Sequence, residues 1–114
     1  MHLCVQRGDI ANRVIICEDS WRAWKLARYF DNPNHCIYVH SPRHFEIYTG
    51  LFQGVPITVL ASGIGTPMVD FAVREAKFVV DGPMAICRFG SACAMSKQTK
   101  IGNVVLASKG GFIV

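Results

Sequence analysis

Arginines placed next to apolar runs offer the clearest chemistry in this sequence. Arg88 follows the apolar residues 84–87 and is itself followed by Gly90 and Ser91. Because a guanidinium keeps its charge on burial, Arg88 needs a carboxylate, several carbonyl groups or an anionic ligand beside it. Backbone N–H groups and a hydroxyl in a tight turn are a common way to hold phosphate. The residues therefore leave two interpretations open, a structural ion pair and an oxyanion site.

Two other arginines and one glycine-rich segment bear on such a site. Arg22 follows the apolar run 13–17, and Arg43 precedes the run 45–52, although each alone also suits an ordinary surface position. The segment Ser62-Gly63-Ile64-Gly65 is similar to a phosphate-binding loop. A lone G-x-G is a weak signal, so close packing of a strand against a helix is the better explanation.

Metal and acid–base chemistry find less support in the sequence. The four histidines, His2, His35, His40 and His44, lack the spacing of metal ligands, so we predict no metal site. The carboxylates of Glu46, Asp70 and Glu75 fall on predicted strand or helix faces. No pair of carboxylates stands out for general acid–base work.

Length and composition limit the class of protein. The 114 residues are 51% apolar with a mean hydropathy of +0.27 and a net charge of +4. We expect one domain over residues 1–114, with apolar surface left for burial against more chain or another subunit. No apolar run is long enough to cross a membrane. The five cysteines include no C-x-x-C pair, which favours a reduced, cytoplasmic compartment.

Strand and helix patterns alternate along the chain. Apolar runs rich in β-branched residues predict strands, helical spacing predicts helices, and Gln53-Gly54 predicts a hairpin turn. We expect Asp19 or Ser20 to cap the first helix, and Thr66 to cap the second with Pro67 at its first position. The predicted strands are 13–17, 36–40, 45–52, 55–61, 84–89 (buried) and 102–108, and the predicted helices run from about 20 to 30 and from about 67 to 81. This order predicts an α/β fold with a mixed sheet.

Ligands of such sheets bind at the carboxyl ends of the strands. Three polar segments, 18–22, 62–66 and 88–91, follow predicted strands. The sheet is therefore expected to bring them to one edge.

The order of these segments resembles the nucleoside phosphorylase family of purine nucleoside and uridine phosphorylases, the uridine phosphorylase branch most closely. Several motifs in the right order are more specific than any one of them. The similar segments are residues 14–22 (a strand and a G-D-P-x-R turn), 42–45 (H-R-E-F), 61–67 (S/T-x-G-I-G-x-P), 88–93 (R-x-G-S/T-x-G) and 101–105 (I-G-D-V-V). Residues 1–3 also resemble the histidine segment at the amino terminus of that family.

The resemblance implies a mixed β-sheet flanked by helices, in the phosphorylase/hydrolase-like fold, truncated to its amino-terminal half. It implies reversible phosphorolysis, in which inorganic phosphate, the co-substrate, attacks the anomeric carbon of a nucleoside and releases the base; no further cofactor is expected. It also implies a homodimer or larger homo-oligomer. The implied residues are Arg88 for catalysis, Arg22, Arg43, Arg88, Gly90 and Ser91 for phosphate, and His2 and Ser91 for ribose, with Arg43 and His2 reaching the neighbouring subunit's site.

Several positions depart from the family pattern. Glu18 stands where the family has glycine, Ser20 where it has proline, Cys93 where it has glycine and Asn103 where it has aspartate. The segments that bind the base and the ribose hydroxyls lie beyond the similar half. We therefore expect the 114-residue chain to be inactive alone, and its base specificity to depend on residues outside it.

Three hypotheses follow for function. The first is a nucleoside phosphorylase of the uridine phosphorylase type, a pentosyltransferase of nucleoside salvage or catabolism. The alternative is a catalytically inactive or truncated paralogue that acts as an assembly or regulatory subunit, which Glu18 and Cys93 favour. A nucleic-acid-binding module is a distant third, because the basic residues are dispersed and not interleaved with aromatics.

Overall fold

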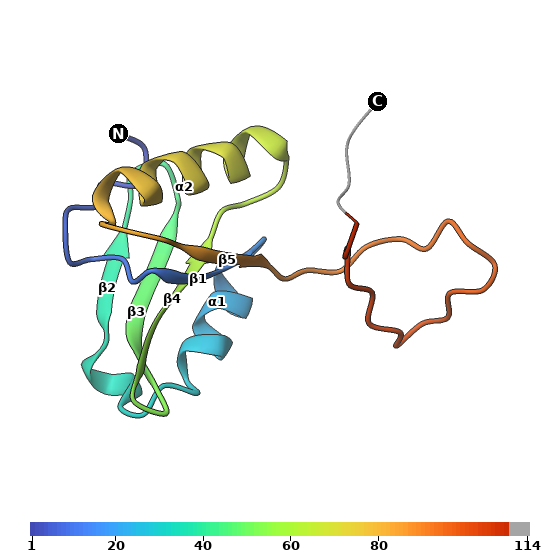
Figure 1. The fold of residues 1–114 in the computed structure, drawn as a ribbon, viewed down its shortest axis with the longest axis horizontal. Coiled ribbons are helices and arrows are strands. Elements are labelled where there is room, and N and C mark those ends of the chain that lie inside the picture. The colour runs from blue at the N-terminus through green and yellow to red at the C-terminus, as the bar shows by residue number, and fades with distance from the viewer. Residues whose placement is uncertain (110–114) are drawn as a thin grey trace.

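The computed structural model describes residues 1–109, which form a five-stranded sheet with a helix on each face and a projecting arm (Figure 1). This architecture confirms the predicted α/β class with a mixed sheet. The elements are β1 (Arg13–Cys17), α1 (Ser20–Ala27), the short 3-10 helix η1 (Pro33–His35), β2 (Ile37–His40), β3 (Glu46–Phe52), β4 (Val55–Ala61), α2 (Thr66–Val79) and β5 (Ala85–Arg88). Among residues 1–109, no helix is both long enough and apolar enough to cross a membrane.

The strands lie in the order β2-β3-β4-β1-β5. β1 is parallel to both β4 and β5, whereas β3 is antiparallel to β2 and β4. The predicted hairpin between β3 and β4 is confirmed, because Gln53 and Gly54 both have positive φ, at 50° and 76°. The Asp31 carboxylate accepts hydrogen bonds from both of their N–H groups, at 2.8 and 2.9 Å. This contact holds the turn against the chain that follows α1.

Alternation along the strands divides the core between the two faces of the sheet. Successive strand residues point to opposite faces, so Leu60 packs beneath α2 while Val59 and Ala61 pack beneath α1. Each helix meets the sheet through alanines, which allow close approach: Ala72 and Ala76 from α2, and Ala23 and Ala27 from α1. The sheet is therefore covered by helices on both sides near β1 and β4.

The helix ends agree with the predictions in part. Asp19 caps α1 by accepting a hydrogen bond from Arg22 N at 2.7 Å, as predicted. The first helix ends at Ala27 and continues only as turns to Phe30, whose N–H bonds Ala27 O at 3.1 Å. The prediction of Thr66 as a cap is wrong, because Gly65 occupies the cap position with φ of 105°, a conformation that favours glycine.

Two predictions near the carboxyl end are wrong: the strand predicted over residues 84–89 forms as β5 but is not buried, and the strand predicted over 102–108 does not form within the described residues. β5 is exposed throughout, because it pairs with β1 alone and forms the edge of the sheet. No strand forms over residues 102–108. These residues lie in the arm that projects away from the sheet beyond β5 (Figure 1), and Val104 is 96% exposed. Without a neighbouring strand the segment has no partner for its backbone groups.

A buried hydroxyl pair joins the hairpin to the chain before β1. Thr49 Oγ1 donates a hydrogen bond to Asp9 O at 2.6 Å and lies 2.8 Å from Thr58 Oγ1. Because the Thr49 proton is used, Thr58 donates to Thr49 and itself accepts from Ala11 N at 2.8 Å. Thr58 is fully buried, so water cannot replace any of these partners.

Replacing Thr58 with valine is expected to lower the free energy of unfolding by about 1–3 kcal/mol, because the Ala11 N–H loses its acceptor in a buried place. Urea denaturation followed by circular dichroism measures the change. The exposed Thr66→Val is the matched control and should stay within about 0.5 kcal/mol of the parent. Equal effects of the two substitutions would contradict the buried network.

Cys17 ends β1 in a fully buried position. The pKa of its thiol is raised to about 11, chiefly by burial and also by the carboxylates of Asp19 and Glu18, while the Arg22 guanidinium opposes the rise. The thiolate is therefore scarce at neutral pH, and since thiolates are the nucleophiles, the group is unreactive.

Iodoacetamide at neutral pH is expected to modify the exposed Cys4 and Cys93 in the native protein and to leave Cys17 untouched. In urea all three should react. Peptide mass spectrometry after timed quenching measures the three rates. Native modification of Cys17 as fast as that of Cys4 would show that the strand end is open.

Candidate functional site

The carboxyl ends of β1, β4 and β5 lie side by side because the three strands are parallel. Backbone pairing continues beyond the strands: Ser62 N bonds Cys17 O at 2.9 Å, Gly63 N bonds Glu18 O at 2.9 Å and Phe89 N bonds Ile16 O at 2.8 Å. The polar segments after the three strands therefore meet at one edge, as the sequence predicted.

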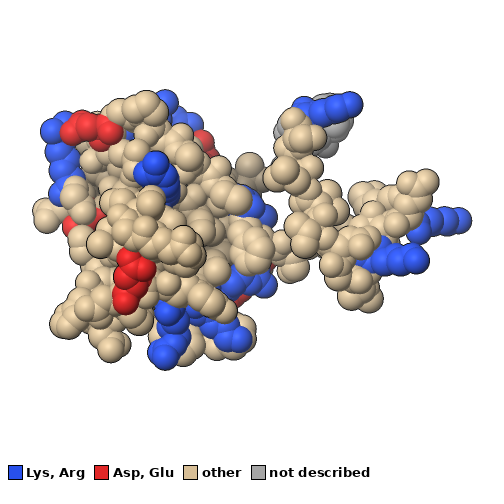
Figure 2. All heavy atoms as spheres, turned by 60° about the horizontal axis from the view of Figure 1, so that its bottom comes forward, with Lys and Arg blue, Asp and Glu red and all other residues tan. Residues whose placement is uncertain are grey.

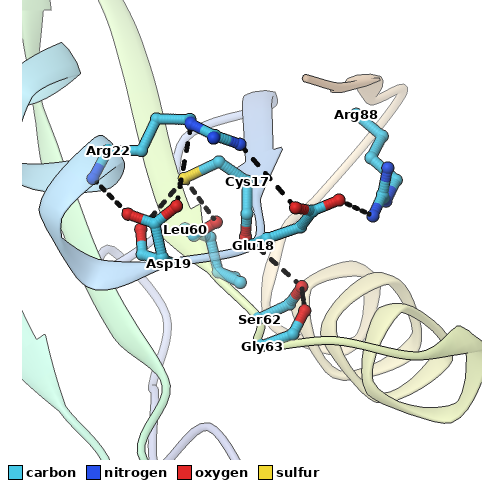
Figure 3. Close-up of polar contacts among 8 residues, drawn as sticks. All are labelled: Cys17, Glu18, Asp19, Arg22, Leu60, Ser62, Gly63 and Arg88. Atoms are coloured by element: carbon cyan, nitrogen blue, oxygen red, sulfur yellow. Dashed lines mark hydrogen bonds and ion pairs between the residues drawn. The ribbon is translucent and has the colours of Figure 1, made fainter. Parts of the chain in front are cut away.

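Glu18 lies between two arginines at this edge (Figure 3). Its Oε1 accepts a hydrogen bond from Arg88 Nη2 at 2.7 Å, and its Oε2 lies 3.8 Å from Arg22 Nη1. The Glu18 side chain is 24% exposed and that of Arg88 is 45% exposed. Of the two interpretations of Arg88, the structure shows the ion pair directly. It also shows two guanidinium groups converging on one carboxylate.

Arg22 is held from its own helix. Its Nε lies 3.7 Å from Asp19 Oδ2, and the same carboxylate caps the helix through Arg22 N. Among residues 1–109, Arg22 Nη1 is the one buried side-chain nitrogen or oxygen with no hydrogen-bond partner. A buried donor left unpaired costs free energy, so this nitrogen favours an additional acceptor at the site.

Gly90 lies beside this cluster, but Gly90 and Ser91 do not form the predicted tight turn. Residues 89–95 have no helix, strand or turn, because they leave the sheet without packing against it. A Cβ added at Gly90 would lie 2.9 Å from Glu18 Oε1 and 3.3 Å from Arg88 Nη1. The absence of a side chain at Gly90 therefore gives the Glu18–Arg88 pair its space. Ser91 is exposed to solvent.

The glycine-rich segment after β4 serves packing. The Ser62 hydroxyl is buried and directed at backbone carbonyls, Cys17 O at 3.4 Å and Gly63 O at 3.1 Å. Because this hydroxyl faces backbone carbonyl groups of its own chain, it supports close packing of the strand against the helix, which is the interpretation that the sequence favoured.

Arg43 lies farther along the same edge, in the loop between β2 and β3. The buried Ser41 holds this loop by accepting a hydrogen bond from His44 N at its carbonyl and another from Phe45 N at its hydroxyl. Three strand spacings separate β3 from β5, about 14 Å at ~4.8 Å per strand. Arg43 therefore does not join Arg22 and Arg88 within one chain.

Arg43 and His2 instead line a common cavity of about 540 Å³. The His2 ring stacks on Phe71 with centroids 4.1 Å apart, and its Nδ1 lies 2.7 Å from Glu75 Oε1. The structure thus divides the predicted site residues into two groups, one around Glu18 and one around this cavity. The other residues that line it are Pro42, His44, Phe45 and Met68.

Sequence reasoning missed the roles of Glu18 and Glu75. Glu18 was noted as a departure from the family pattern, but its pairing with Arg88 spans 70 positions. Glu75 accepts hydrogen bonds from His2 N at 2.7 Å and Leu3 N at 2.8 Å, which fixes the amino-terminal segment on α2. No short-range pattern in the sequence signals either contact.

Two further observations concern possible metal ligands and the distribution of basic side chains. No group of three or more His, Cys, Asp or Glu residues in this part of the chain is placed to hold a metal ion. Figure 2 shows lysines and arginines at separate places on the face drawn and along the arm, with acidic side chains between them.

Glu75 gives the amino-terminal anchor a defined pH dependence. Burial alone would raise the pKa of this carboxyl, but hydrogen bonds from Leu3 N, His2 N and the His2 ring outweigh burial and hold its pKa below the ordinary value. Because this pKa is lowered, the anchor stabilises the fold fully when the pH is above the ordinary pKa of glutamate. The stabilisation is lost as the pH falls through the lowered pKa.

Glu75→Gln is therefore expected to destabilise the protein at neutral pH, and the difference from the parent should shrink in acid as the parent's own carboxyl becomes protonated. Urea midpoints at several pH values measure this difference, and amide exchange at Leu3 reports the anchor itself. Asp70→Asn, which removes an exposed carboxylate paired with Arg74 on the same helix, is the control. A difference that is constant with pH would disprove the assignment.

Comparison with known proteins identifies the family of this chain. The Phosphorylase superfamily sequence pattern matches residues 12–110. A solved structure from a study of two uridine phosphorylases of the oomycete Phytophthora capsici superposes with a TM-score of 0.84 at 39% identity, over 88% of this chain and 34% of that one.

Curated relatives of two kinds agree. A uridine phosphorylase of Thermococcus kodakarensis is 29% identical over 93% of this chain and 36% of its own length. A DeoD-type purine nucleoside phosphorylase of Streptococcus pneumoniae is 29% identical over 94% of this chain and 44% of its own length. The chain thus spans less than half the length of these relatives, and it belongs to the phosphorylase superfamily.

Proposed function

We propose that this chain forms the phosphate-binding part of a nucleoside phosphorylase of the uridine phosphorylase type. In this reaction an oxygen of inorganic phosphate bonds to C1′ of the nucleoside as the C1′–N bond breaks. The bonding electron pair leaves with the base, which takes up a proton, and the sugar is left as a pentose 1-phosphate. Positioning of phosphate and stabilisation of charge carry most of such catalysis.

One observation carries the proposal. Arg88 Nη2 and Arg22 Nη1 approach the two oxygens of a single carboxylate, at 2.7 and 3.8 Å, where three parallel strands end. The Glu18 carboxylate is a small oxyanion, so the geometry that holds it also suits a phosphate oxygen. The buried Nη1 of Arg22, which has no hydrogen-bond partner within residues 1–109, adds a donor that a larger oxyanion can use.

The second group of residues fits a neighbouring subunit. Arg43 and His2 line a cavity away from Arg22 and Arg88, so within one chain they do not reach the proposed phosphate. In the proposed enzyme they act across an interface between two copies, Arg43 on phosphate and His2 on the ribose. Ser91, which is exposed in this chain, is assigned to phosphate and ribose in the proposed enzyme.

A non-catalytic assembly subunit is the second candidate, and one contact favours it. Glu18 already satisfies Arg88, so the cluster is stable without phosphate. Such a subunit would form the oligomer without releasing base from any nucleoside in the presence of phosphate.

The test uses the natural-length protein and its variants, each purified after expression. We expect phosphate-dependent release of uracil from uridine, and Arg88→Ala should raise the KM for phosphate about 10- to 100-fold. A lost charge-assisted hydrogen bond costs ~1.5–3 kcal/mol, and ~1.4 kcal/mol is a factor of ten. The KM for uridine should change little.

Arg74→Ala is the matched control, since it removes an arginine that is exposed on α2 and paired only with Asp70. It should leave both KM values unchanged. No phosphate-dependent base release from uridine or inosine would reject the enzyme and leave the assembly subunit.

A further inference from the structure

We infer that Glu18 sets the affinity of this site for phosphate, because its carboxylate is an internal anion that occupies the place between Arg22 and Arg88. The inference rests on the proposed function, since it concerns the same oxyanion position. Phosphate binds only as the Glu18 carboxylate moves away from Arg88. Glu18 is thus a determinant of specificity that weakens the binding of tetrahedral dianions.

Backbone pairing places Glu18 at the centre of the cluster. Its carbonyl accepts the Gly63 N–H at 2.9 Å, so the residue is tied to the chain beyond β4. From this fixed backbone the side chain extends toward Arg88, as Figure 3 shows, and its two oxygens separate to the two guanidinium groups. The fold therefore places the Glu18 main chain where its carboxylate reaches both guanidinium groups.

The space around the carboxylate is limited. A Cβ at Gly90 would come within 2.9 Å of Glu18 Oε1, so the chain passes directly against this oxygen. A phosphate bound to Arg88 in the same direction would meet Glu18 Oε1, which holds Arg88 Nη2 at 2.7 Å. The two anions therefore compete for one donor.

Charge opposes their coexistence. Two like charges about 4 Å apart repel strongly near a protein surface, where the effective dielectric constant is well below that of water. Among the charged groups of this cluster, Asp19 also lies near Arg22, with Oδ2 at 3.7 Å from Nε. Asp19 is fixed as the cap of α1, whereas Glu18 has no backbone donor in residues 1–109 to hold its carboxylate. Glu18 is therefore the group that yields to phosphate.

The test measures binding of inorganic phosphate by equilibrium dialysis with radiolabelled phosphate, using the natural-length protein and its variants. Glu18→Gln keeps the size of the side chain and removes its charge. We expect it to lower the Kd for phosphate about tenfold or more. Arg88→Ala in the Glu18→Gln background should reverse the gain, because the freed donor belongs to Arg88.

Glu46→Gln is the matched control. It neutralises a carboxylate on β3 at the same edge of the sheet, where Glu46 lies 3.5 Å from His40 Nδ1, and it should leave the Kd unchanged. Circular dichroism verifies that each variant keeps its fold.

The outcomes separate this inference from the proposed function. If Glu18→Gln binds phosphate more tightly than the parent and Glu46→Gln does not, the result supports both the inference and the proposed function. Saturable binding by the parent with an equal or higher Kd for Glu18→Gln overturns the inference and leaves the phosphate site standing. An equal gain from Glu46→Gln also overturns it, because the effect would then be one of overall charge. No binding by the parent or any folded variant overturns both.

Discussion

Parallel pairing of β1 with β4 on one side and β5 on the other is the constraint on which the rest of this structure depends. It brings three chain segments that are distant in sequence to one edge, and the backbone bonds of Ser62, Gly63 and Phe89 extend that pairing past the strand ends. Glu18 and Arg88 meet because their strands are neighbours in register, with Ile16 opposite Arg88. The chemistry of the edge is a consequence of this register.

The same edge explains why charge is tolerated there. The residues of β1 and β4 face two apolar layers, one beneath each helix, whereas Glu18 and Arg88 are partly exposed. Arg88 lies on an exposed edge strand, so its guanidinium is hydrated on one side and paired with Glu18 on the other. An exposed ion pair of this kind contributes little stability, ~0–1 kcal/mol. The pairing therefore organises the site more than it holds the fold together.

Local patterns in the sequence were enough for most of the fold. The five strand runs before residue 90, the Gln53-Gly54 turn and the Asp19 cap depend on neighbours a few residues away, and the structure contains each of them. The cap of α2 was predicted one residue too late, at Thr66 in place of Gly65, because Thr66 is also a good cap and backbone dihedral angles decide between the two. Predictions failed where partners decide the outcome. Residues 102–108 have the pattern of a strand, but within residues 1–109 no strand lies beside them.

The site, like the fold, was predictable where it depends on local residue types and not where it depends on contacts between distant segments. Sequence reasoning selected Arg22 and Arg88 by their position after strands, and the structure brings them together. It assigned Glu18 only as a substitution for glycine, because its contact with Arg88 depends on the order of strands in the sheet. That contact gives the substitution a physical meaning, because Glu18 supplies an anion to the position between the two arginines. In the proposed phosphate site the protein thus provides an anion of its own, and phosphate would have to compete with a group that is always present at high effective concentration.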